Sequence, residues 1–245
     1  MPKVWVVGHR GASGHAPENT LAAFRRAVEM GAGFIETDLH ITRDAKLVAI
    51  HDATLERTTN GRGAVKDFTL AELQQLDAGS WFHPDFRGER IPSIEEVIAF
   101  ARQADIGLFL EIKPDAPWGI EHGLLAMLRG SGESHRVVVL SFSTGILRNV
   151  RRIDNTQVTG LLLDAVPNGG MNALFDRVRE TGARQLAPRG DVVSPEMIEQ
   201  AQRHDLQVIC WTVNEVADMR QLAALGVHGI MTDFPDRLAQ VLNES

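Results

Sequence analysis

The alternation of short apolar runs with longer amphipathic segments is the feature that most constrains the fold of this chain. Eight apolar runs have the length of strands: residues 4–7, 34–38, 108–112, 137–140, 158–163, 185–187, 207–211 and 229–232. Eight segments with helical periodicity follow them: residues 20–30, 94–103, 120–128, 145–153, 171–181, 195–204, 216–225 and 237–242. Strand runs that are almost continuously apolar are typical of parallel strands buried on both faces. The pattern predicts an α/β fold, the (β/α)8 TIM barrel.

A ninth apolar run, residues 47–51, does not fit the parallel pattern. It follows the second predicted strand too soon for the crossover that a parallel neighbour requires, so its return must be antiparallel. With the turn centred between Asp44 and Ala45, His51 is expected directly opposite Asp38.

Residues 53–92 form a long polar connection after the second predicted barrel strand. Connections at this end of a barrel strand lie on the face that carries active sites. A connection of this length is typical of a functional segment. We therefore predict one barrel domain over residues 1–245, with an inserted cap region at about residues 53–92, part of which is removable without unfolding the barrel.

Charge and cysteine content exclude some classes of protein. The chain of 245 residues carries a net charge of −7, which argues against nucleic-acid binding through a basic surface. The single cysteine, Cys210, excludes an internal disulfide and favours a reducing compartment. No run approaches the roughly 18 apolar residues of a membrane helix. Because candidate site residues begin within the first ten positions, we expect a cytoplasmic protein without a cleaved signal peptide.

Three acidic residues lie at the ends of predicted strands. Glu36 and Asp38 are two positions apart and so face the same side of one strand, and Glu111 ends the next barrel strand. Carboxylates that converge at one barrel mouth repel one another, and a divalent cation relieves the repulsion. Because all the ligands are oxygen atoms, Mg²⁺ or Ca²⁺ is favoured over zinc.

The remaining strand-end residues can bind a phosphate and move protons. Arg10 and Lys113 are the local cations for a phosphate ester. His9 and His51 have ordinary pKa values near 6.5, which suits a general acid and a general base. Trp211, after the seventh barrel strand, either packs at the mouth or forms a wall for the substrate.

The segment Pro-Glu-Asn-Thr at residues 17–20 precedes the first predicted helix. Its simplest interpretation is a helix start with Asn19 as the N-cap residue. Its position next to His9 in the sequence leaves a role in the site open.

These pieces together resemble the glycerophosphodiester phosphodiesterase family. The matching motifs are His9-Arg-Gly11, residues 17–20, Glu36-x-Asp38, His51-Asp52, residues 58–61, residues 77–81, Ile91-Pro92, residues 111–113, Ser141-Phe142, residues 211–214 and residues 232–235. The resemblance implies a barrel with a small insertion, and metal-dependent hydrolysis of deacylated phospholipids to an alcohol and glycerol 3-phosphate. It implies that Glu36, Asp38 and Glu111 are metal ligands, that His9 and His51 are the acid–base pair, and that Arg10 and Lys113 bind phosphate. The alcohol stays open.

The chemistry admits two routes. In one, the glycerol C2 hydroxyl attacks phosphorus and gives a cyclic phosphate that water opens; in the other, water attacks directly. We expect a small-molecule glycerophosphodiester as the partner, no nucleic acid and no stable membrane association. The oligomeric state is left open.

Two other functions are alternatives. A related barrel phospholipase or lyase acting on phospholipid head groups would need an apolar rim, but Trp81, Phe82 and Phe86 are interspersed with charged residues. A non-catalytic barrel binding module would have no need of two titratable histidines.

Overall fold

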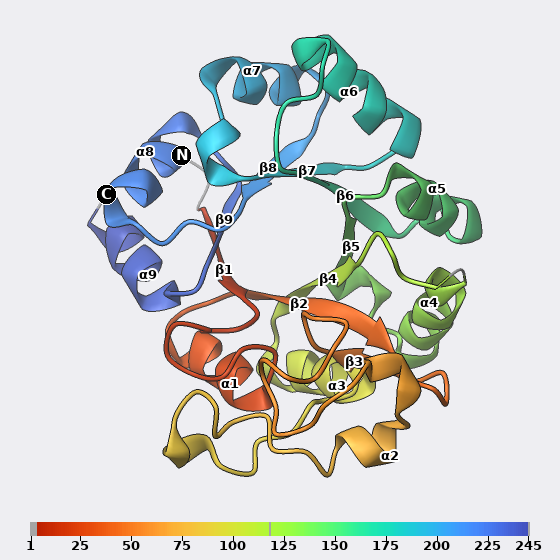
Figure 1. Ribbon diagram of the computed structural model, residues 1–245. Helices are drawn as coiled ribbons and strands as arrows, with labels where there is room; N and C mark the ends of the chain where they lie inside the picture. Colours follow the sequence, from red (N-terminus) through yellow and green to blue (C-terminus); the bar gives the residue numbers. More distant parts are fainter. Residues whose placement is uncertain (1–3, 118, 245) are drawn as a thin grey trace.

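The computed structural model describes residues 4–117 and 119–244 and shows a closed parallel barrel (Figure 1). The ring contains β1 (Trp5–His9), β2 (Phe34–Ile41), β4 (Gly107–Ile112), β5 (Val137–Ser141), β6 (Val158–Leu163), β7 (Gln185–Pro188), β8 (Gln207–Cys210) and β9 (Gly229–Thr232). Each strand pairs in parallel with its ring neighbours, and β1 closes the ring by pairing with both β2 and β9. The predicted TIM barrel is confirmed.

Helices cover the outside of the ring (Figure 1). They are α1 (Leu21–Glu29), α3 (Ile94–Ala104), α4 (Ile120–Ser131), α5 (Thr144–Ile153), α6 (Gly170–Thr181), α7 (Pro195–Arg203), α8 (Val216–Leu225) and α9 (Pro235–Asn243). Several begin with a hydroxyl cap; Ser93, for example, forms a capping box with Glu96 at the start of α3. Within the described part of the chain, no helix has the length and apolarity needed to cross a membrane.

The barrel interior is packed below its mouth. A cluster of buried side chains inside the ring contains Val7, Phe109, Val138, Leu140, Leu162, Ala187, Ile209 and Met231. Trp5, Phe34 and Phe109 stack across the interior, with ring centroids 4.8 Å apart for the first pair and 5.5 Å for the second. The polar strand-end residues therefore lie above an apolar layer inside the ring.

The strand β3 (Leu47–Ala49) pairs with β2 in the antiparallel direction and lies outside the ring, as predicted. Its expected register was wrong by one residue. Ile50 donates its backbone N–H to the Asp38 carbonyl at 3.2 Å, so Ile50, not His51, lies opposite Asp38. The turn is centred on Asp44, because Ala45 takes a left-handed backbone conformation (φ 57°) and lengthens the turn.

Residues 53–92 lie beside β3 and α3 at one side of the barrel (Figure 1). They contain α2 (Leu70–Leu73) and the short 3₁₀ helices η1 (Val65–Asp67) and η2 (Pro84–Phe86). Two further 3₁₀ helices, η3 (Ser134–Arg136) and η4 (Gly190–Val192), belong to the barrel connections. The segment packs on Val48 of β3 and on Ile50, and the resulting apolar cluster is apart from the barrel core; its other members are Leu55, Val65, Leu73, Ala78 and Ile91.

Candidate active site

The carboxyl ends of β1, β2 and β4 bring the predicted polar residues to one barrel mouth. Parallel pairing places His9 beside Glu36 and Asp38 beside Glu111. A cavity of about 210 Å³ opens there, lined by His9, Arg10, Glu36, His51, Glu111, Lys113, Leu140, Phe142, Leu162, Trp211 and Met231. Residues from the two ends of the sequence, more than 200 positions apart, thus share one small chamber.

Three carboxylates form a buried cluster beside this cavity. Glu36, Asp38 and Glu111 each offer an oxygen, and these oxygens lie within 4.8 Å of one another. Glu111 Oε1 is buried and has no hydrogen-bond partner among the described residues. Burial and the charge of Asp38 raise the pKa of Glu36 to about 7. A crowded oxygen cluster with an unsatisfied buried acceptor fits a hard divalent cation, which would supply the missing partner and offset the repulsion.

Two cations pair with these carboxylates. Lys113 Nζ contacts Asp38 Oδ1 and lies 3.0 Å from Glu111 Oε2. Arg10 Nε lies 3.3 Å from Asp38 Oδ2, and the Arg10 backbone N–H donates to Glu36 Oε2 at 3.1 Å. Burial alone would raise the pKa of Asp38, but Lys113 and Arg10 hold it well below its ordinary value. Both predicted phosphate-binding residues thus lie at the cavity with their charges directed at the acidic cluster.

The prediction that Asn19 is the N-cap residue of the first helix was wrong. Thr20 is the cap, because its hydroxyl accepts from Ala23 N at 3.2 Å. Asn19 is buried, and its Nδ2 donates to Asp38 Oδ2 at 2.9 Å while its Oδ1 accepts from Thr37 Oγ1 at 2.6 Å. Asn19 therefore orients a carboxylate of the acidic cluster, and a left-handed backbone (φ 57°) turns it inward.

His9 is held by a carboxylate that sequence reasoning did not single out. Its Nδ1 lies 2.7 Å from Asp233 Oδ1, in the loop after β9, and Asn214 donates to Asp233 Oδ2 at 2.7 Å. Burial alone would lower the pKa of His9, but the hydrogen bond with Asp233 and the charge of Glu36 outweigh it and raise that pKa. His9 Nε2 lies 3.5 Å from Thr212 Oγ1.

His51 has the same arrangement on the other side of the mouth. Its Nδ1 lies 2.7 Å from Asp52 Oδ1, and the ring of His40, within β2, bonds the His51 carbonyl at 3.0 Å. Burial and the positive charge of Arg10 lower the pKa of His51 by more than the negative charge of Asp38 raises it. Each predicted acid–base residue therefore has its Nδ1 on a carboxylate, which leaves Nε2 for the cavity.

Trp211 both packs and lines the cavity. Its indole Nε1 donates to the Ala187 carbonyl at 2.6 Å, and its ring meets Phe142 edge to face with centroids 5.5 Å apart. With Leu162 and Met231 these rings form an apolar wall opposite the charged residues. The cavity thus has one charged half and one apolar half.

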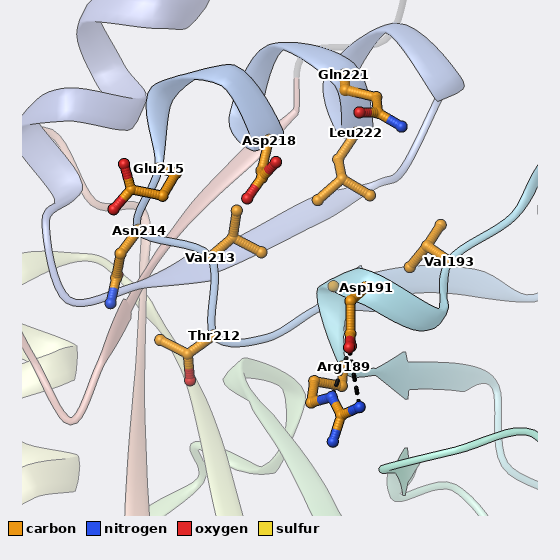
Figure 2. Close-up of a pocket in the computed structure, with 11 residues that line it drawn as sticks. Arg189, Asp191, Val193, Thr212, Val213, Asn214, Glu215, Asp218, Gln221 and Leu222 are labelled. Atoms are coloured by element: carbon orange, nitrogen blue, oxygen red, sulfur yellow. Dashed lines mark hydrogen bonds and ion pairs between the residues drawn. The ribbon is translucent and has the colours of Figure 1, made fainter.

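A larger cavity of about 420 Å³ lies next to the mouth, between η4 and α8 (Figure 2). It is lined by Arg189, Gly190, Asp191, Val193, Thr212, Val213, Asn214, Glu215, Asp218, Gln221 and Leu222. Figure 2 shows Val213 pointing into it, while Thr212 and Asn214 point the other way. Those two side chains contact His9 and Asp233 instead, so the connecting segment separates this cavity from the candidate catalytic groups.

The fold and the site together define a TIM barrel whose mouth carries the groups for acid–base chemistry: a buried carboxylate triad and two carboxylate-bound histidines. The profile of the Glycerophosphoryl diester phosphodiesterase family matches residues 9–237, so the chain belongs to that family. Glycerophosphodiester phosphodiesterase activity follows from this membership.

Comparison with individual relatives gives the same family. A glycerophosphodiester phosphodiesterase of Caldanaerobacter subterraneus is 38% identical, and the alignment covers 99% of both chains. One from Bacillus subtilis is 36% identical, over 98% of this chain and 86% of the relative. The solved structure of an Oleispira antarctica phosphodiesterase in complex with sn-glycerol-3-phosphate superposes with a TM-score of 0.88 at 28% identity, covering 98% and 96% of the two chains.

Proposed function

We propose that this chain hydrolyses small glycerophosphodiesters, such as glycerophosphocholine or glycerophosphoethanolamine, to an alcohol and glycerol 3-phosphate, in a metal-dependent reaction. The observation that carries the proposal is one cavity of about 210 Å³ that is lined by two oriented histidines and by Glu36 and Glu111 of the metal-compatible carboxylate cluster. The relative from Oleispira antarctica is described as a complex with the product sn-glycerol-3-phosphate, which supports the choice of product.

Glu36, Asp38 and Glu111 would hold the metal, Mg²⁺ or Ca²⁺. The unsatisfied Glu111 Oε1 and the raised pKa of Glu36 support this assignment, because a bound cation would give the oxygen a partner and offset the repulsion between Glu36 and Asp38. When bound, the ion supplies positive charge for phosphoryl oxygens and lowers the pKa of a hydroxyl. Arg10 and Lys113, at the edge of the same cluster, bind and orient the phosphate.

The two histidines move the protons. The base takes the proton of the glycerol C2 hydroxyl, whose oxygen forms a bond to phosphorus as the bond to the leaving alcohol breaks. The acid gives its proton to that alcohol, and a five-membered cyclic glycerol phosphate is left. Water then opens the ring with the roles reversed, giving glycerol 3-phosphate.

The environments of the histidines support different starting roles. The pKa of His9 is raised by its bond with Asp233, and the pKa of His51 is lowered by burial. Two groups whose pKa values are moved apart suit an acid and a base. His9 is therefore the acid in the first step and His51 the base.

The size of the cavity supports a deacylated substrate. Ligand pockets are usually about 300–1,000 Å³, so a chamber of about 210 Å³ is small and suits a headgroup diester. The apolar wall of Trp211 and Phe142 covers the carbon atoms of the substrate. The buried Cys210 is consistent with a reducing, cytoplasmic location.

A panel assay tests the function. Glycerophosphodiesters with choline, ethanolamine, glycerol and inositol head groups are incubated with the enzyme, with and without EDTA, and the products are identified by phosphorus NMR. We expect glycerol 3-phosphate and no head-group phosphate. Cleavage of phospholipid vesicles in preference to every soluble diester would support the barrel lyase alternative, and no cleavage of either would support a binding module.

A further inference from the structure

Arg57 connects the loop between β1 and α1 with the segment that follows β3. It lies in the segment 53–92, shortly after His51. Its Nε donates to Asp52 Oδ2 at 2.7 Å and its Nη2 to Asp52 Oδ1 at 3.0 Å. The same guanidinium donates to Glu18 through Nη1 and Nη2, each at 2.8 Å.

Each of the two carboxylates has a second partner in the active site. Asp52 Oδ1 also lies 2.7 Å from His51 Nδ1, and Glu18 Oε1 accepts from Arg10 Nη1 at 2.9 Å. The chain of contacts therefore runs from Arg10 through Glu18, Arg57 and Asp52 to His51. It connects a phosphate-binding residue to an acid–base residue through one planar group.

The geometry points to Arg57 as a positioning residue: it fixes Asp52 so that His51 keeps its proton on Nδ1 and presents Nε2 to the substrate, and it fixes Glu18 so that Arg10 faces the phosphate. This inference rests on the roles proposed above for His51 and Arg10. An ionised carboxylate can only accept, so Asp52 selects one tautomer of the ring.

The proposed role of Arg57 depends on the geometry of its guanidinium more than on its charge. Four donated bonds to two carboxylates use the fork shape of a guanidinium, which a lysine ammonium cannot reproduce. The Arg57 side chain is 42% exposed, so solvent partly screens its charge. The hydrogen bonds of Arg57 and His51 keep the pKa of Asp52 far below its ordinary value, so that Asp52 remains an acceptor.

The test compares Arg57→Lys with Arg43→Lys. Arg43 is a matched control, because it forms a two-point pair with Glu72 at the outer end of the β2–β3 turn and is 56% exposed. Turnover of glycerophosphocholine is measured for both variants. The His51 tautomer is read from ring-nitrogen NMR of the metal-loaded protein, with the His51 signals assigned by comparison with His51→Gln.

We expect Arg57→Lys to lower kcat by roughly 10–100-fold, the usual effect of losing a residue that orients a functional group, and to mix the His51 tautomers. Because lysine keeps the positive charge between the two carboxylates, the melting temperature of this variant should stay within about 3 °C of wild type. Asp52→Asn should give the same His51 signature, and adding Arg57→Lys to it should cost little more. Arg43→Lys should match wild type in every readout.

Wild-type kcat in Arg57→Lys would overturn the inference. So would a loss of activity with both the His51 tautomer and the KM for glycerophosphocholine unchanged, because neither His51 nor the phosphate-binding Arg10 would then depend on Arg57. If Arg57→Lys unfolds, the His51 tautomer is measured in Asp52→Asn instead, and an unchanged tautomer there would overturn the inference. A wild-type enzyme that cleaves no diester would instead refute the proposed function, and the tautomer comparison would still decide what Arg57 does.

Discussion

At the scale of single residues, the site depends on partners that hold each functional group in one orientation. His9 and His51 come from different elements, yet each has Nδ1 at 2.7 Å from an aspartate. The sequence offered a signal for one of these, because Asp52 directly follows His51. Asp233 lies in the 232–235 motif, but nothing in the sequence pairs it with His9, 224 positions away, because only barrel closure brings the two together. Candidate site residues could therefore be predicted from strand ends, whereas the contact between His9 and Asp233 could not.

The two histidines should be separable by leaving group. His9→Ala and His51→Ala should each lower kcat by roughly 10²–10⁴, the usual contribution of a positioned proton donor or acceptor. A nitrophenyl ester needs little protonation, so it should lose less rate in His9→Ala, whereas His51→Ala should slow both substrates. Steady-state kinetics on both esters check this. The same loss for both esters in both variants would refute the assignment, and loss of bound metal in either would make that histidine a ligand.

The pair of His9 and Asp233 should also contribute to stability in a pH-dependent way. Burial alone would raise the pKa of Asp233, but its bonds to His9, Ser13 and Asn214 lower it to about 2. Because the folded pKa is lowered, this contribution is present above the unfolded pKa near 3.9 and is lost as pH falls toward 2. Asp233→Asn should therefore be less stable than wild type by on the order of 2 kcal/mol at about pH 6, and the difference should shrink below about pH 4. Urea unfolding at several pH values measures this, and a constant difference across that range would contradict it.

At the scale of elements, turns bring side chains to positions that the pattern of strands alone does not predict. The loop from β1 to α1 is tight because Gly11 has φ 85°, and a Cβ there would lie 2.6 Å from the Ala23 backbone. The loop reverses the chain so that Asn19 reaches Asp38, a contact that the helix-cap interpretation did not foresee. The one-residue error in the β3 register has a similar origin, because the left-handed backbone of Ala45 leaves no clear signal in the sequence.

The segment 53–92 is expected to be separable in part from the barrel, a prediction that deletion can test. Residues 79–88 form a loop whose ends meet, with Ala78 N bonded to Glu89 O at 2.8 Å, and Asp77 accepts from Gly79, Ser80 and Gly88 within it. Replacing residues 79–88 by a short glycine linker should leave one cooperative unfolding transition, because the barrel core is a different cluster. Thermal unfolding followed by circular dichroism checks this. Loss of the cooperative transition would show that the segment is part of the core.

At the scale of the whole molecule, the residues that stabilise the barrel and the residues of the candidate site lie in different parts of the ring. Its strand count and parallel order follow from apolar runs that need two covered faces, and so could be predicted from the sequence. The cluster inside the ring forms the base, and the charged residues lie on it at the strand ends. Keeping three carboxylates ionised at this buried position costs free energy, and burial raises the pKa of both Glu36 and Glu111. Arg10 and Lys113 offset part of this repulsion, and the three carboxylates could hold a metal ion that offsets the rest.

The most direct test of this account is glycerol 3-phosphate release by the enzyme stripped of metal and then reloaded. Enzyme exhaustively treated with a chelator should release no glycerol 3-phosphate from glycerophosphocholine, and adding Mg²⁺ or Ca²⁺ should restore turnover. Asp38→Asn should not recover at the same metal concentration, because it removes a charged ligand of the cluster. Full turnover by the stripped enzyme would contradict the metal-dependent mechanism.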